Sequence, residues 1–128
     1  MKKVYICSPL GGDVAGNLEK VKLYVKYALM CDVAPVASHF YALSLNDDIP
    51  FERAIGTRAG IALLEMCDEV WAIGNNLTIG IAQEIAEAFK LGIPVIRIDE
   101  KQIYNKLEME VDNNEKIDKI GQSTQGLV

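Results

Sequence analysis

The sequence of 128 residues is poor in the residues that build metal sites and disulfide frameworks. It has one histidine, His39, and three cysteines, Cys7, Cys31 and Cys67, with no Cys-x-x-Cys pair among them. An odd number of widely spaced cysteines argues against a disulfide framework. A lone histidine without clustered cysteines or carboxylates argues against a dedicated metal site. We therefore expect no metal, no cofactor, and reduced, buried cysteines in a cytoplasmic protein.

Long apolar runs and an excess of basic residues are also missing. No run approaches the roughly 20 residues of a membrane span, and the amino-terminal segment reaches Ser8-Pro9 too soon for a signal peptide. The formal net charge is −5, whereas nucleic-acid binding relies on Lys and Arg that neutralise phosphates. We expect a small-molecule partner rather than a nucleic acid or a membrane, and a small ligand with one or two phosphates stays open.

Short apolar runs alternate with longer amphipathic stretches, which is the pattern of an α/β protein. The predicted buried strands are Val4–Cys7, Pro35–Ser38, Val70–Ile73 and Pro94–Ile98. The predicted helices run from about Val14 to Cys31, from Phe51 to about Met66 after Pro50, and from Thr78 to Leu91. Strands that alternate with helices pair in parallel. We expect a single-domain, doubly wound (flavodoxin- or Rossmann-like) sheet of about four to five strands flanked by helices.

The pattern weakens near residue 99, so we expect an α/β domain over residues 1–99 and an acidic C-terminal extension over residues 100–128. The residues whose alternation with acids predicts an edge strand are Leu107, Met109 and Val111. The stretch from Ile117 to Gly121 fits a short helix, and the remaining residues fit a frayed tail.

Ligands of open parallel sheets bind beyond the carboxyl ends of the strands, where the strand order reverses. This rule selects the segments after the first three predicted strands. They contain Ser8, Gly11, Gly12 and Asp13, then Ser38 and His39, then Gly74 to Thr78. We expect these loops to converge on one cleft.

Each of these loops also has a purely structural interpretation. The Ser8–Asp13 loop offers backbone N–H groups for ribose hydroxyls or a phosphate, but it matches neither the dinucleotide-binding nor the P-loop pattern, and a plain tight turn explains it equally well. His39 is placed to meet an anion or to cap a buried carbonyl. Thr78 is placed to cap its helix or to grip an anion with it. A phospho-acceptor receiver domain is disfavoured, because the third strand ends in Ile73-Gly74 rather than an aspartate.

Glu84 lies one helical turn beyond Gly80 in the helix that follows the third strand. Helical side chains lean toward the helix N-terminus, so the carboxylate is expected to reach back over Gly80 into open space. Ala88 occupies the position four residues on, which leaves Glu84 without the Lys or Arg that explains many surface acids. The alternative is an ordinary solvated helical glutamate.

The order of elements, together with three motifs, resembles the nucleoside 2-deoxyribosyltransferase superfamily, and within it a small phage and bacterial branch known as a domain of unknown function (DUF4406). The motifs are Tyr5-Ile-Cys-Ser-Pro-Leu-Gly-Gly-Asp13, Cys67-Asp-Glu-Val-Trp-Ala-Ile-Gly74 and Thr78-Ile-Gly-Ile-Ala-Gln-Glu84-Ile. The similarity covers about residues 3 to 98.

The resemblance implies an N-glycosidic bond enzyme, a hydrolase or a deoxyribosyltransferase, acting on a deoxynucleoside or its 5′-monophosphate. Glu84 matches the glutamate that attacks the anomeric carbon and forms a glycosyl-enzyme intermediate. The nearby helix N-terminus is expected to favour its ionised form by about 0.3–1 kcal/mol. Thr78 matches a hydroxyl that binds the 5′-phosphate, and His39 resembles a histidine near that phosphate. The superfamily also implies a homo-oligomer, a dimer or larger.

One residue departs from the pattern of the active relatives. They carry an aspartate near the nucleobase where this chain has Gly60. That aspartate protonates or orients the leaving base. In this chain the same task falls to another residue, such as Asp47 or Asp48, or to none. The alternative function is therefore a non-catalytic protein that senses or sequesters a nucleoside or nucleotide.

Overall fold

A parallel sheet of four strands forms the centre of the computed structural model, which describes residues 1–109. The strands are β1 (Lys3–Cys7), β2 (Ala34–Val36), β3 (Glu69–Ile73) and β4 (Val95–Ile98). Their order is β2-β1-β3-β4, and Val4 of β1 pairs with Pro35 on one side and Glu69 on the other. The chain thus moves outward from β1 to β2 and then crosses back to β3. This confirms the doubly wound sheet and puts the reversal of strand order between β1 and β3.

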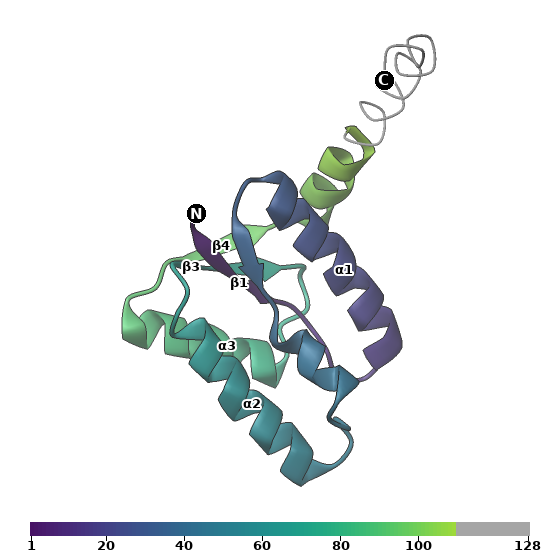
Figure 1. The fold of residues 1–128 in the computed structure, drawn as a ribbon, viewed down its shortest axis with the longest axis vertical. Coiled ribbons are helices and arrows are strands. Elements are labelled where there is room, and N and C mark those ends of the chain that lie inside the picture. The colour runs from purple at the N-terminus through teal and green to yellow at the C-terminus, as the bar shows by residue number, and fades with distance from the viewer. Residues whose placement is uncertain (110–128) are drawn as a thin grey trace, which may run out of the picture.

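Helices cover both faces of the sheet (Figure 1). They are α1 (Val14–Met30), the short 3-10 helix η1 (Ser38–Leu43), α2 (Pro50–Leu64) and α3 (Ile79–Leu91). Helix α1 packs on one face, and α2 and α3 pack on the other. No helix within residues 1–109 has both the length and the apolar character that a membrane crossing requires.

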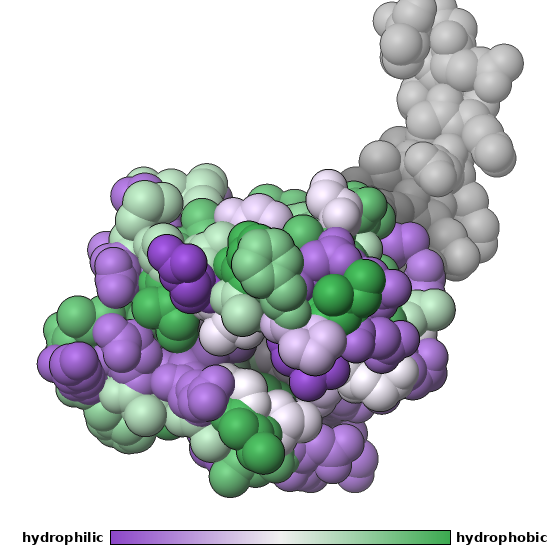
Figure 2. Space-filling view, turned by 90° about the horizontal axis from the view of Figure 1, so that it is seen from below, coloured by the Kyte–Doolittle hydropathy of each residue, from purple (hydrophilic) through white to green (hydrophobic). Residues whose placement is uncertain are grey.

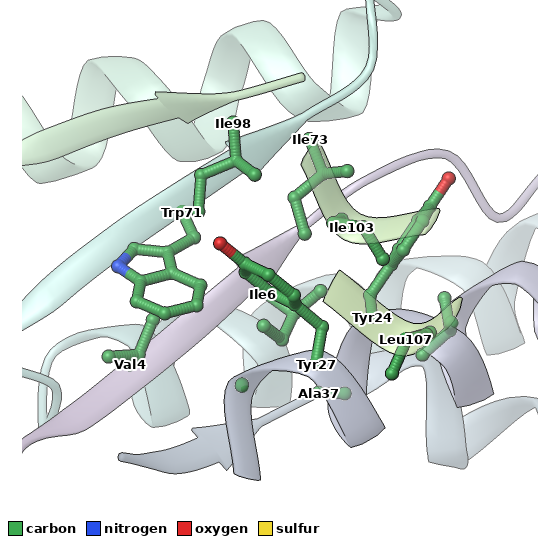
Figure 3. Close-up of a cluster of buried hydrophobic side chains, with 12 residues drawn as sticks. Val4, Ile6, Tyr24, Tyr27, Ala37, Trp71, Ile73, Ile98, Ile103 and Leu107 are labelled. Atoms are coloured by element: carbon green, nitrogen blue, oxygen red, sulfur yellow. The ribbon is translucent and has the colours of Figure 1, made fainter. Parts of the chain in front are cut away.

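The strand β1 divides the core by simple alternation, because successive side chains of a strand point to opposite faces. Val4 and Ile6 face α1, whereas Tyr5 and Cys7 face α2 and α3. On the α1 face the rings of Tyr27 and Trp71 lie 5.9 Å apart between centroids. Figure 3 shows this cluster, which includes side chains from the sheet, from α1 and from the segment after β4.

The ends of α3 follow directly from its sequence. The Thr78 hydroxyl accepts a hydrogen bond from the Ile81 N–H at 3.1 Å and caps the helix start. Gly92 ends the helix with φ of 72°, in the left-handed region that favours glycine. Both ends agree with the prediction.

The edge strand predicted around Leu107 and Met109 is wrong, because residues 100–109 form a helix. Ile103 and Leu107 are four residues apart, so they share one helix face, and both belong to the core cluster under α1. The Tyr24 hydroxyl donates to Glu100 at 2.7 Å and holds the start of this segment. Val111 and the helix and tail predicted beyond it lie outside the described residues.

The second strand and the loop after it also differ from the prediction. The strand β2 ends at Val36 rather than Ser38, because Ser38 already begins η1. A 3-10 helix of this length has no periodic signal in the sequence. As a consequence, Ser38 and His39 sit on a helical turn that faces β1 rather than at the end of a strand.

Candidate active site

A cavity of about 420 Å³ opens at the carboxyl end of β1, between α2, α3 and η1. Its size lies within the range of small-molecule sites. Seven of the nine predicted site residues line it, namely Ser8, Gly11, Gly12, His39, Thr78, Gly80 and Glu84. In Figure 2 the molecule is seen from below, and hydrophobic and hydrophilic residues intermingle over this face. The structure therefore brings residues of all three predicted loops together.

The other two predicted residues lie elsewhere. Asp13 caps α1, where its carboxylate accepts from the Gly16 N–H at 3.1 Å. Gly74 follows β3 with φ of 88° and borders a separate space of only about 20 Å³, next to Cys7 and Arg97. Neither residue contributes to the wall of the larger cavity.

Glu84 presents a shielded carboxyl group to the cavity. Its Oε2 atom is buried and has no hydrogen-bond partner within the described part of the chain. Burial raises the pKa of Glu84 to about 7, although the Tyr5 hydroxyl and the Cys7 thiol interact with the carboxylate and lower the pKa in part. Desolvation thus outweighs the small effect expected from the helix start, which favours the ionised form. At neutral pH both protonation states of Glu84 are populated.

Two side chains of β1 provide the surroundings of Glu84, and the search for site residues along the sequence missed both. Burial raises the pKa of the Tyr5 hydroxyl and of the Cys7 thiol above their ordinary values. Both groups therefore stay protonated and present hydrogen-bond donors to the carboxylate. The sequence did contain a signal for Tyr5. It is a tyrosine in an otherwise apolar strand, and its side chain points to the face of the sheet that borders the cavity.

The start of α3 is open toward the cavity. A Cβ atom at Gly80 would have Thr78 Oγ1 as its nearest neighbour, at 3.9 Å. No side chain of α3 therefore fills the space one turn before Glu84. The N–H groups of Ile79 and Gly80, at the start of the helix, lie before the first intrahelical hydrogen bonds.

His39 is buried and neutral. Its Nε2 atom lies 2.8 Å from the Ser8 carbonyl oxygen and 3.1 Å from Ser8 Oγ. A carbonyl oxygen only accepts, so Nε2 carries the proton and Nδ1 has a free lone pair. Burial lowers the pKa of His39, and the bond to the Ser8 backbone offsets part of this change. His39 thus caps a buried carbonyl and holds the Ser8 loop, and it offers an anion no positive charge.

The loop after β1 is held from a second side by α1. The Asn17 amide donates to the carbonyl oxygens of Leu10 and Gly11, at 2.9 and 3.2 Å. Opposite this loop, the Asp47 carboxylate comes so close that a Cβ atom at Gly11 would lie 3.0 Å from Asp47 Oδ2. Glycine at position 11 therefore permits the loop after β1 to approach the loop that carries Asp47.

Acidic side chains outnumber basic ones in the cavity wall. Besides Glu84, the wall includes Asp47, Asp48 and Glu52, with Arg53 as its one basic residue. The Arg53 Nε atom donates to the Asp47 carbonyl at 2.9 Å and lies 3.6 Å from Asp47 Oδ1, so part of its charge is already matched. Within residues 1–109 no group of histidine, cysteine and carboxylate side chains is arranged to hold a metal ion.

A family model described as a domain of unknown function (DUF7768) matches residues 2–98. The chain belongs to this family. DUF7768 is not the DUF4406 branch expected from the motifs. The matched residues end with β4, so they include β1, α2 and α3 around the cavity. No protein of curated function matches this DUF7768 member in sequence.

Solved structures with the same fold include two deoxyribosyltransferases. The 2-deoxyribosyltransferase of Bacillus psychrosaccharolyticus is 17% identical with a TM-score of 0.61, over 76% of this chain and 72% of that one. The 2-desoxiribosyltransferase of Leishmania mexicana is 20% identical with a TM-score of 0.52, over 77% and 65%. A conserved protein of Enterococcus faecalis V583 is 21% identical with a TM-score of 0.55, over 76% and 62%. The DUF7768 chain thus has the deoxyribosyltransferase fold and spans less than two thirds of the last two proteins.

Proposed function

We propose that the cavity binds a deoxynucleoside and that Glu84 cleaves its N-glycosidic bond as a nucleophile. The observation that carries this proposal is a desolvated carboxyl group, with one oxygen unpartnered, in the wall of a cavity of about 420 Å³. Two proteins that share the fold are 2-deoxyribosyltransferases, which supports this class of reaction. A partly desolvated carboxylate is a stronger nucleophile than a solvated one, because water no longer stabilises its charge.

The reaction that this arrangement supports has two steps. In the first, a Glu84 oxygen forms a bond to the anomeric carbon, the bond from that carbon to the base nitrogen breaks, and the base leaves with the electron pair. In the second, water or another base attacks the same carbon, which breaks the ester bond and restores the carboxylate. Water as the acceptor makes the protein a hydrolase, and a second base makes it a transferase.

The leaving base must also gain a proton. Gly60 has no side chain to supply one, whereas Asp47 and Asp48 both line the cavity. We assign this task to one of these two carboxyl groups. The Tyr5 hydroxyl and the Cys7 thiol, which interact with the Glu84 carboxylate, orient the nucleophile instead.

The wall of the cavity favours a nucleoside over a nucleoside 5′-monophosphate. His39 is neutral and the guanidinium of Arg53 is engaged by Asp47. Three further carboxylates, from Asp48, Glu52 and Glu84, would face a phosphate dianion. The N–H groups at the start of α3 are the main attraction left for a phosphate, and we expect them to be insufficient.

Base release tests the proposal. The protein is incubated with each common deoxynucleoside and its 5′-monophosphate, and free base is measured by chromatography with and without a second base as acceptor. We expect release from deoxynucleosides and a loss of at least about 10³-fold with Glu84→Gln, because the amide cannot form the ester. Glu87→Gln is the matched control, since Glu87 lies on the same helix outside the cavity wall.

A nucleoside-binding protein without turnover is the second candidate function, and Gly60 is the observation that favours it. The same experiment separates the two candidates. Tight binding of a nucleoside without release of any base would establish the binding protein, whereas release that survives in Glu84→Gln would exclude Glu84 as the nucleophile.

A further inference from the structure

Tyr5, Ser38 and Gly60 meet in the cavity wall and form a contact that depends on glycine. The Tyr5 hydroxyl and Ser38 Oγ are 2.9 Å apart and share a hydrogen bond. A Cβ atom at position 60 would lie 3.2 Å from Ser38 Cβ and 3.3 Å from the Tyr5 hydroxyl oxygen. A side chain at position 60 would therefore press on both partners. The polar atoms of this part of the wall come from Ser38 and Tyr5.

The charge of Glu84 determines which way the hydrogens of this pair point. The Tyr5 hydroxyl interacts with the Glu84 carboxyl group. An ionised carboxylate can only accept, so the Tyr5 proton turns toward it. Ser38 then donates its proton to the Tyr5 oxygen, and the lone pairs of Ser38 Oγ remain available to a ligand. In the ionised state of Glu84, Ser38 is therefore a hydrogen-bond acceptor.

His39, the next residue along η1, presents a second acceptor. Its Nε2 proton is committed to the Ser8 carbonyl at 2.8 Å. The Nδ1 atom is buried without a partner within the described residues, and the residue as a whole is only 5% exposed. A buried acceptor without a donor costs free energy.

The charged groups of the wall are mostly acceptors as well. Asp47, Asp48 and Glu52 contribute carboxylates, and Arg53 already donates to the Asp47 carbonyl. Ser38 on η1 and the carboxylates of residues 47–52 thus place acceptors at one cavity. Such a wall binds a ligand edge that carries donors and penalises one that carries only acceptors.

We propose that Ser38 is a specificity residue of this cavity, which accepts a hydrogen bond from an exocyclic amino group of the nucleobase. This inference rests on the proposed function, because it assumes that a nucleoside occupies the cavity. It adds that bases with an amino group are selected over the same bases without one. It also gives Gly60 a role, since a side chain at position 60 would press on the Ser38–Tyr5 pair.

Free bases test the selection without any glycosidic bond to break. Two pairs differ by one amino group each, adenine against purine and cytosine against 2-pyrimidinone. Dissociation constants are measured by calorimetry with the wild-type protein at about pH 8, where Glu84 is mostly ionised. We expect each amino-bearing base to bind roughly 3- to 10-fold more tightly than its partner, the usual effect of one hydrogen bond.

Ser38→Ala identifies the residue responsible. It should bring the adenine-to-purine ratio close to one while the affinity for purine changes little, whereas merely structural damage would weaken both bases alike. Ser44→Ala is the matched control, because Ser44 is exposed and lies outside the cavity wall. If Ser38→Ala does not fold, Ser38→Cys keeps the size of the side chain with a much weaker acceptor and should lower the ratio in the same direction.

The outcomes separate this inference from the proposed function. Equal affinities within both pairs, or a ratio that persists in Ser38→Ala, would overturn the selection by Ser38. Base release from deoxynucleosides would then still support the proposed function. Failure of every base to bind, together with no base release from any deoxynucleoside, would overturn both.

Discussion

Burial of the Glu84 carboxyl group changes its reactivity and its effect on stability together. The wall of the cavity removes water from this carboxyl group and raises its pKa to about 7. A carboxyl group whose pKa rises on folding destabilises the folded protein at the pH values where the group is ionised. The position of Glu84 was predictable from its spacing to Gly80 in the sequence. Its protonation was not, because the burial that raises its pKa arises only in the tertiary fold.

The first prediction concerns stability at two pH values. The pKa of Glu84 is 4.5 in the unfolded chain, and burial raises it to about 7 in the folded protein. Between these values the unfolded chain releases its proton first, so a rise in pH favours unfolding. Glu84→Gln removes this penalty and should stabilise the protein by about 2 kcal/mol at about pH 8, with little gain at about pH 5.

Urea denaturation of wild type and variant at both pH values measures this difference. Glu87→Gln, on the same helix but outside the cavity wall, serves as the matched control. A gain from Glu84→Gln that is equal at the two pH values would show that the carboxyl group is solvated.

At the scale of elements, local signals decided which predictions succeeded. Helix α3 has a capping threonine and a glycine in the left-handed region, and both of its ends were predicted. The alternation of Leu107 and Met109 with acids instead pointed to a strand. Tertiary packing decides which face of the helix of residues 100–109 is buried. Ile103 and Leu107 are buried under α1, whereas Met109 is 63% exposed. The 3-10 helix η1 likewise forms where the chain packs against β1.

The second prediction tests this docking. Ile103 is fully buried in the core cluster under α1. Ile103→Ala should lower the free energy of unfolding by about 3 kcal/mol, because it removes buried methyl groups and leaves a cavity. Met109→Ala in the same helix should cost less than about 0.5 kcal/mol. Similar losses for both variants in urea denaturation would contradict the packing described for this helix.

At the scale of the whole molecule, the site is a consequence of parallel topology. Strands that run in the same direction bring their following loops to one edge of the sheet, and the reversal between β1 and β3 leaves a crevice there. This rule predicted the region of the cavity before the structure was known. The rule selected Ser38, but it did not predict that the loop at Asp47 and helix α2 at Gly60 also line the cavity. Those contacts depend on a long loop whose course has no periodic signal in the sequence.

If Glu84 is the nucleophile, it forms a covalent bond to the deoxyribosyl group during the reaction. This bond is tested by mixing the protein with a deoxynucleoside, quenching rapidly with acid and analysing proteolytic peptides by mass spectrometry. We expect a mass increase of one deoxyribosyl group on the peptide that contains Glu84, with the modification on that residue. Release of base with an unmodified Glu84, or a deoxyribosyl group attached to another residue, would rule out Glu84 as the nucleophile.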